Sequence, residues 1–164
     1  MRLFVLMGVS GCGKTSVGEA LADSTDITFF DGDDLHPAEN IAKMSRGVPL
    51  NDVDRAPWLA QVGRKLAGHE GRVVIGCSAL KRSYRDIIRQ NAGEPVMFLH
   101  LAAPKAVLAK RVADRPGHFM PAALLDSQFA ALEQLHADEA GAVISIDQPL
   151  VGVVSDARRH LAQG

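Results

Sequence analysis

Short apolar runs alternate with amphipathic segments along the chain. Five largely apolar runs have the character of strands in a buried parallel sheet: residues 2–7, 27–30, 72–80, 95–101 and 142–147. Between them, apolar residues recur at helical spacing and predict helices over residues 14–23, 38–46, 54–68, 83–91, 104–115, 121–135 and 150–162. This alternation predicts an α/β fold with helices on both faces of a parallel sheet. Right-handed crossovers would put a ligand site at the carboxyl ends of the strands.

Length and composition fit one globular domain, which we expect to span residues 1–164, with 47% of the residues hydrophobic. The formal net charge of −1 gives no reason to expect binding to nucleic acid or to an anionic membrane. Cys12 and Cys77 form neither a metal-ligand spacing nor a disulfide framework. No apolar run approaches the roughly 20 residues that a membrane span needs. We therefore expect a cytoplasmic protein.

A glycine-rich sequence directly follows the first predicted strand. Residues 8–15 read GVSGCGKT and match the phosphate-binding P-loop pattern G-x-x-x-x-G-K-[ST]. Glycines let the backbone curl so that its N–H groups point at phosphate oxygens, and the next helix adds its positive N-terminal end. Lys14 would reach the β- and γ-phosphates, and the Thr15 hydroxyl would ligate Mg²⁺. The residues expected to bind ATP here are Gly8, Val9, Ser10, Gly11, Cys12, Gly13, Lys14 and Thr15.

Acidic residues follow the second predicted strand in the sequence DGDD, at the same sheet edge as the P-loop. Residues two apart on an extended segment point the same way, so Asp31 and Asp33 can share one site. We assign Asp31 to the metal and Asp33 to the role of catalytic base that accepts a proton from an attacking hydroxyl. An acidic turn is the competing interpretation. The third predicted strand ends without a carboxylate, which leaves Asp31 as the acidic partner for Mg²⁺.

Several cations lie where the predicted helix over residues 104–115 breaks into the sequence RPGH. A proline and a glycine at such a break suit a lid, which we expect at about residues 114–122. The lid would bring Arg115 down as a catalytic arginine that neutralises charge during phosphoryl transfer, with Arg111 and Arg115 both binding ATP. A surface loop fits the same residues equally well.

Four stretches together resemble the small P-loop gluconokinases: GVSGCGKTSVG, DGDDLHPAENIAKMSRGVPLNDVDRAPWL, GCSALKRSYRDIIR and RPGHFMPAALLDSQFAALE. The resemblance runs from residue 3 to about residue 162. It implies a nucleoside-monophosphate-kinase-like P-loop fold with strand order 2-3-1-4-5. It also implies ATP-dependent phosphorylation of D-gluconate at its terminal hydroxyl, with 6-phospho-D-gluconate and ADP as products, and a homodimer.

Gluconate carries a carboxylate and a row of hydroxyls, so its site needs a cation at one end and polar groups along its length. We favour Lys81 with Arg85 and Arg55 for the carboxylate, and His36 and Asp54 for hydroxyls. A solvated helix face is the competing interpretation for the cations. The candidate substrate-binding residues are Asp33, His36, Lys43, Asp54, Arg55, Lys81, Arg85 and His118. Trp58 is either a wall of this site or part of the core.

Two other function classes remain open at this point. One is a different small-molecule kinase on the same scaffold, acting on shikimate or adenylylsulfate; the turn GCSALKR lacks the triple glycine of shikimate kinases. The other is a non-catalytic ATP-binding module, which would keep Lys14 and Thr15 but would not need Asp33. The sequence N-K-x-D, with which GTPases read their base, does not occur.

Overall fold

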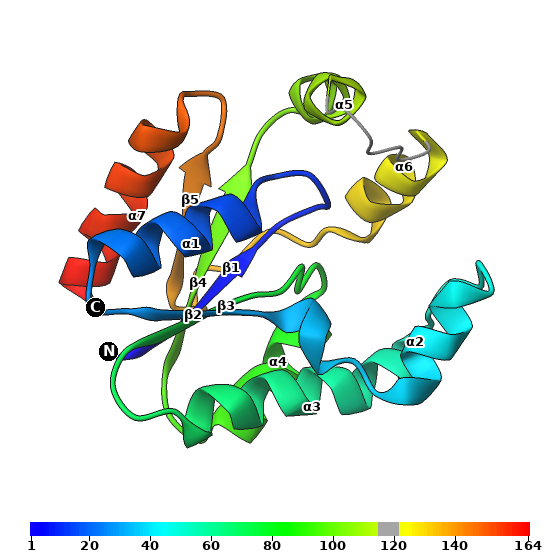
Figure 1. Cartoon of the computed structure of the whole chain (residues 1–164), viewed down its shortest axis with the longest axis horizontal. Coiled ribbons are helices and arrows are strands. Elements are labelled where there is room, and N and C mark those ends of the chain that lie inside the picture. Colours follow the sequence, from blue (N-terminus) through cyan, green and yellow to red (C-terminus); the bar gives the residue numbers. More distant parts are fainter. Residues whose placement is uncertain (115–121) are drawn as a thin grey trace.

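One parallel sheet organises the molecule. The computed structural model describes residues 1–114 and 122–164. Its strands are β1 (Leu3–Met7), β2 (Thr28–Asp31), β3 (Val73–Gly76), β4 (Val96–Ala102) and β5 (Gly141–Ser145). They pair in parallel in the order β2-β3-β1-β4-β5, which confirms the predicted order 2-3-1-4-5 (Figure 1).

Helices cover both faces of this sheet. Helices α1 (Lys14–Ser24) and α7 (Leu150–Gln163) lie on one face, and α3 (Asp52–Gly68) and α4 (Arg82–Ala92) lie on the other (Figure 1). Three more helices lie toward the carboxyl ends of the strands: α2 (Ala38–Ser45), α5 (Lys105–Ala113) and α6 (Ala122–Ala131). A 3-10 helix, η1 (Gly32–Leu35), follows β2. No helix among the residues just described has the length and apolar character needed to cross a membrane.

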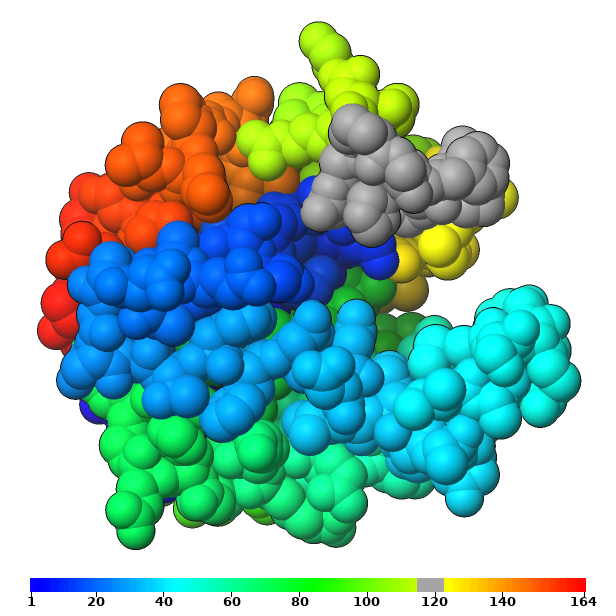
Figure 2. Space-filling view, in the orientation of Figure 1, coloured from blue at the N-terminus to red at the C-terminus, as the bar shows by residue number. Residues whose placement is uncertain are grey.

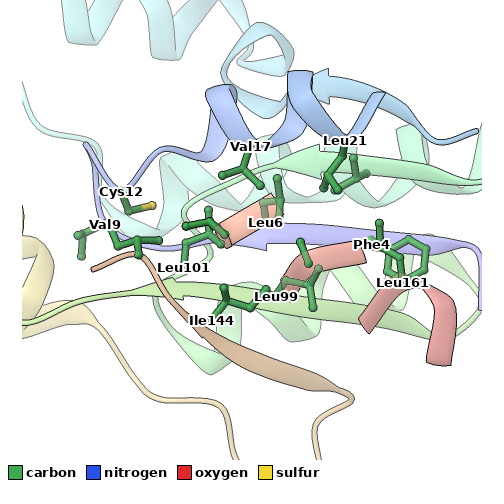
Figure 3. Packing of buried hydrophobic residues seen from close by; sticks show 14 of the residues in the cluster. Phe4, Leu6, Val9, Cys12, Val17, Leu21, Leu99, Leu101, Ile144 and Leu161 are labelled. Carbon is green, nitrogen blue, oxygen red and sulfur yellow. The ribbon is translucent and has the colours of Figure 1, made fainter. Parts of the chain in front are cut away.

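Strand β1 lies at the centre of the core because both of its faces are covered. Leu3, Val5 and Met7 belong to the cluster under α3 and α4, whereas Phe4 and Leu6 belong to the cluster under α1 and α7. All five are fully buried. Figure 3 shows the second cluster, in which Val17, Leu21 and Leu161 pack over the sheet. Alternate side chains of a strand point to opposite faces, so an unbroken apolar strand can be buried on both.

Two predicted elements run four residues past the observed ends. Strand β3 ends at Gly76 and not at residue 80, because the backbone turns away through Ala79, whose φ of 45° is left-handed. Helix α6 ends at Ala131 and not at residue 135, because Glu133 donates its backbone N–H to the Leu80 carbonyl at 2.7 Å. The turn after β3 is also held from a distance, because the Gly8 N–H donates to the Ser78 carbonyl at 3.1 Å.

Candidate active site

The P-loop follows β1 and leads directly into α1. Gly13 begins α1 in the left-handed conformation, at φ 97°. At Gly8, with φ 149°, a Cβ would lie 2.8 Å from the Leu101 carbonyl oxygen, so these two positions require glycine. The Lys14 ammonium donates to the carbonyls of Gly8 at 3.0 Å and Val9 at 3.3 Å. The loop therefore combines a fixed cation with a helix N-terminus, an arrangement that attracts phosphate.

Asp31 and Thr15 meet beside this loop. The Thr15 hydroxyl lies 3.5 Å from Asp31 Oδ2 and donates to it. The other carboxylate oxygen of Asp31 accepts from the Asp33 backbone N–H at 2.9 Å, which caps η1 and fixes the Asp31 side chain. A hydroxyl and a carboxylate side by side are oxygen donors of the type that Mg²⁺ prefers. The predicted metal pair is thus brought together.

Asp33 faces the same loop. It lines a cavity of about 200 Å³ together with Lys14, Thr15 and other P-loop residues. Loss of water around the carboxyl raises its pKa, the charge of Asp31 raises it further, and the Lys14 ammonium opposes both. A carboxylate with a raised pKa is a stronger base than an ordinary aspartate. Asp33 therefore combines the position and the basicity needed to accept a proton next to a bound phosphate.

A second cavity, of about 360 Å³, adjoins the P-loop. It shares Gly11 and Gly13 with the Asp33 cavity and extends to Gln148 and Leu150 at the start of α7. Arg111 lines it as well, and its guanidinium donates to the Ile146 and Gln148 carbonyls. A mainly apolar cavity with a few polar groups is suited to a flat heteroaromatic base. Arg111 thus lines the cavity that has room for a base, with its guanidinium held by the backbone.

A cluster of cations lies at the start of α3 and α4. Lys81 Nζ is 3.4 Å from one carboxylate oxygen of Asp52, and Arg55 Nη1 is 3.7 Å from the other. Tyr84 joins them, since its hydroxyl donates to Asp52 and accepts from Arg55 at 3.3 Å. Two cations share one carboxylate, so the cluster keeps a net positive charge for an anionic ligand. In Figure 2 the molecular surface is hollowed between α2 and the part of the molecule that carries the P-loop.

His36 and Trp58 form a stacked pair next to the acidic residues. Their ring centroids are 4.1 Å apart and the planes differ by 15°. Trp58 is only 4% exposed, and its indole N–H donates to the Gly32 carbonyl at 2.8 Å. Trp58 is therefore part of the core and at the same time the support for His36.

Lys43 and Asp54 are paired with each other. The Lys43 ammonium lies 2.6 Å from Asp54 Oδ2. The same carboxylate accepts from the Asn51 backbone N–H at 3.0 Å and completes a capping box at the start of α3. Hydrogen bonds from Lys43 and Asn51 lower the pKa of Asp54. Both side chains thus tether α2 to α3, a structural function that the sequence prediction did not include.

Comparisons with known proteins agree with this geometry. A protein-family profile described as an AAA domain matches residues 3–135. The thermosensitive gluconokinase of Escherichia coli strain K12 is 47% identical over 161 residues, which cover 95% of this chain and 85% of that protein. The gluconokinase of Gluconobacter oxydans strain 621H is 46% identical over 164 residues, which cover 97% of this chain and 90% of that protein. The chain belongs to the gluconokinase family. The crystal structure of a gluconokinase from Sinorhizobium meliloti 1021 superposes with a TM-score of 0.90, at 48% identity, covering 99% of this chain and 92% of that one.

The structure contradicts one expectation for this gluconokinase-family chain. Arg85 is fully buried and makes a two-pronged ion pair with Glu139, at 2.7 and 3.0 Å. Its remaining N–H groups donate to the carbonyls of Ala79, Leu80 and Gln134. With these donors engaged inside the protein, the structure argues against Arg85 as a substrate ligand. Arg85 instead supports the β3–α4 loop that carries Lys81.

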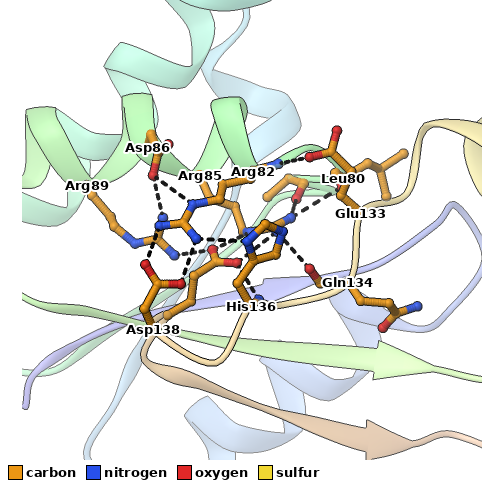
Figure 4. A network of polar contacts seen from close by, with 11 residues as sticks. Leu80, Arg82, Arg85, Asp86, Arg89, Glu133, Gln134, His136 and Asp138 are labelled. Atoms are coloured by element: carbon orange, nitrogen blue, oxygen red, sulfur yellow. Dashed lines mark hydrogen bonds and ion pairs between the residues drawn. The ribbon is translucent and has the colours of Figure 1, made fainter.

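Arg85 belongs to a larger polar network between α4 and the segment before β5 (Figure 4). Arg82 pairs with both carboxylate oxygens of Asp138 at 2.7 Å, and Arg89 also binds Glu139. Burial alone would raise the pKa of Glu139, but hydrogen bonds from Arg85, the His136 backbone and Arg89 outweigh it and hold the pKa at about 2. Glu139 is therefore ionised at neutral pH.

Replacing Glu139 by glutamine is expected to lower the free energy of unfolding by about 3–5 kcal/mol, because it leaves the Arg85 charge buried without a counter-charge. Urea denaturation at pH 7 measures the change. The folded pKa of about 2 lies below the ordinary value of 4.5, so this stabilisation is complete above pH 4.5 and is lost as the pH falls toward 2. The control is Glu94→Gln at the partly exposed Arg2–Glu94 pair, where we expect less than about 1 kcal/mol. Equal effects at the two positions would contradict the structural role of Glu139.

Arg115, His118 and most of the predicted lid fall on residues 115–121, outside the residues that the structure describes.

Polar contacts that shape the site were not predicted from the sequence. Gln128 of α6 binds the P-loop at Ser10. Its Oε1 accepts from the Ser10 N–H at 2.6 Å, and its Nε2 donates to the Ser10 hydroxyl at 2.9 Å. The partners are 118 residues apart, so no local signal points to this contact. Asn40, in contrast, is four residues after His36, and that spacing could have suggested a pair.

Proposed function

We propose that the chain transfers the γ-phosphoryl group of ATP to the terminal hydroxyl of D-gluconate, giving 6-phospho-D-gluconate and ADP. The observation that carries this proposal is the shared cavity of Asp33 and Lys14, in which a proton acceptor faces the phosphate-binding loop. The naming of the chain's relatives as gluconokinases supports gluconate as the acceptor.

ATP would lie along the P-loop. Its base would occupy the cavity lined by Arg111, and its phosphates would receive the loop N–H groups and the Lys14 ammonium. Thr15 and Asp31 would hold Mg²⁺, which neutralises charge on the phosphates when bound. The chain's own part in this step is to fix the phosphate tail so that its last phosphorus faces Asp33.

Gluconate would lie in the crevice between Asp33 and the cation cluster. Asp33 would accept the proton of the attacking hydroxyl, and Lys81 and Arg55 would hold the carboxylate. His36 would contact a hydroxyl of the substrate, since its ring is near enough to Asp33 and Arg55 for both charges to act on it. Lys43 and Asp54 would act indirectly by holding α2 against α3.

Further parts of the proposal concern the chain as a whole. It would form one kinase domain over residues 1–164, with a lid at about residues 114–122 that supplies Arg115 to ATP and His118 to the substrate. We also propose a homodimer, testable by light scattering. A cytoplasmic location is supported by Cys12 and Cys77, which are both free and buried.

A coupled ADP-release assay tests the activity. Purified protein is given ATP and Mg²⁺ with gluconate, shikimate, adenylylsulfate or a nucleoside monophosphate, and turnover is expected only with gluconate. Addition of EDTA should abolish it, and excess Mg²⁺ should restore it. Turnover with another acceptor would reassign the substrate, and tight ATP binding without turnover on any acceptor would show a non-catalytic module.

A further inference from the structure

Asn40 is buried in a helix that is otherwise largely exposed. It is 4% exposed, whereas Ile41 beside it is 55% exposed. Its side-chain Nδ2 lies 2.9 Å from the Asp54 carbonyl oxygen and 3.2 Å from Nδ1 of His36. One amide group thus contacts both the start of α3 and the histidine ring.

These two contacts determine where the proton of His36 lies. A backbone carbonyl can only accept, so the Asn40 atom that faces Asp54 must be the amide nitrogen and not the oxygen. The same nitrogen then presents its second hydrogen to His36 Nδ1, which must offer a lone pair. A neutral imidazole has a single N–H, so in His36 it is on Nε2.

The His36 ring is also fixed in orientation. It stacks on Trp58, which the Gly32 carbonyl anchors. The charged groups that act on the ring are Asp33 of η1 and Arg55 of α3, with opposite signs. His36 is therefore close enough to the proposed catalytic base and to the proposed carboxylate anchor to respond to both charges, and its ring has a single defined donor.

We propose that Asn40 is a positioning residue that holds His36 as an Nε2–H donor, and that this donor recognises a hydroxyl oxygen in the middle of a polyhydroxy acid. The identity of the substrate rests on the proposed function, but the protonation of the ring does not. A ligand that lacks an acceptor oxygen at this point leaves the Nε2–H unpaired and binds less well.

The first test is spectroscopic and needs no activity. In protein labelled with ¹⁵N-histidine, two-bond ¹H–¹⁵N correlation identifies the protonated nitrogen, and the His36 signal is assigned by its loss in His36→Gln. We expect the Nε2–H form in the wild type. In Asn40→Asp the new carboxylate can only accept, so we expect the proton to appear on Nδ1. An Nδ1–H ring in the wild type, or an unchanged ring in Asn40→Asp, would overturn the proposal.

The second test is kinetic. Asn40→Asp is expected to raise KM for gluconate by about tenfold, with a smaller change in kcat and none in KM for ATP. His36→Ala should behave similarly, whereas His36→Gln keeps a donor near Nε2 and should recover most of the loss. The matched control is Asn91→Asp, at a side chain that donates within α4 to the Ile87 carbonyl, where KM should not change.

The outcomes separate the two proposals. Equal KM values for His36→Ala and His36→Gln, or a loss in kcat alone, would overturn the donor role of His36. A wild-type protein that does not phosphorylate gluconate would overturn the proposed function, while the ¹⁵N signals would still decide whether Asn40 fixes the ring.

Discussion

Replacing Asp33 by asparagine is expected to lower kcat by about 10²–10⁴-fold and to leave KM for ATP nearly unchanged. The amide keeps the shape of the side chain but cannot accept the proton of the attacking hydroxyl. The Asp33 backbone N–H would still donate to Asp31, so the cap of η1 and the metal pair should survive. Steady-state kinetics with gluconate and ATP varied in turn measure both constants.

The neighbouring acid provides the control. Asp34 lies in the same 3-10 helix but does not line the cavity that Asp33 shares with Lys14, so Asp34→Asn changes the charge equally and should leave kcat within about twofold. A pH profile adds an independent check. Burial, and then the charge of Asp31, raise the pKa of Asp33 in the free protein above its ordinary 3.8. The wild-type kcat/KM, which reports the free enzyme, should therefore fall as acidification protonates this base at a higher pH than an ordinary aspartate. A normal kcat in Asp33→Asn would remove Asp33 from catalysis.

Replacing Lys14 by alanine is expected to weaken ATP binding and to lower kcat by about 10²–10³-fold, because the charge that faces the transferring phosphoryl group is lost. The change also removes the two hydrogen bonds by which the ammonium holds the Gly8 and Val9 carbonyls. Calorimetric titration with a non-hydrolysable ATP analogue measures binding, and the coupled assay measures turnover.

The matched control is Lys110→Ala, at an exposed lysine of α5. This substitution removes the same charge at a position away from the P-loop, so ATP binding and kcat should be nearly unchanged. Normal ATP binding in Lys14→Ala would contradict phosphate binding at the loop, whatever its effect on turnover.

The elements around the P-loop were predictable from the sequence because their determinants are local, whereas the strand order came only from the resemblance to gluconokinases. The apolar run that becomes β1, the P-loop motif after it and the helical spacing of α1 are each contained within a few residues. The ends of elements were less predictable. The turn at Ala79 and the end of α6 depend on contacts between the β3–α4 loop and residues more than 50 positions away, such as Glu133.

Arg85 shows the same limit within the site. Its place after β3 and its charge fit an anion-binding residue, and the sequence contains nothing local that distinguishes it from Lys81. The residue that distinguishes Arg85 from Lys81 is its counter-ion Glu139, which is 54 residues later in the sequence and which the fold brings next to α4. A charged residue at the functional edge of a sheet is therefore a binding candidate only until its distant counter-ion is known.

The tether between α2 and α3 has a mechanical consequence. Asp54 holds α2 twice, through its carboxylate on Lys43 and through its carbonyl on Asn40. With both attachments at the first turn of α3, α2 cannot move relative to α3 unless both contacts break. A rearrangement that narrows the crevice from this side and keeps these contacts must carry the first turn of α3, and Arg55 with it.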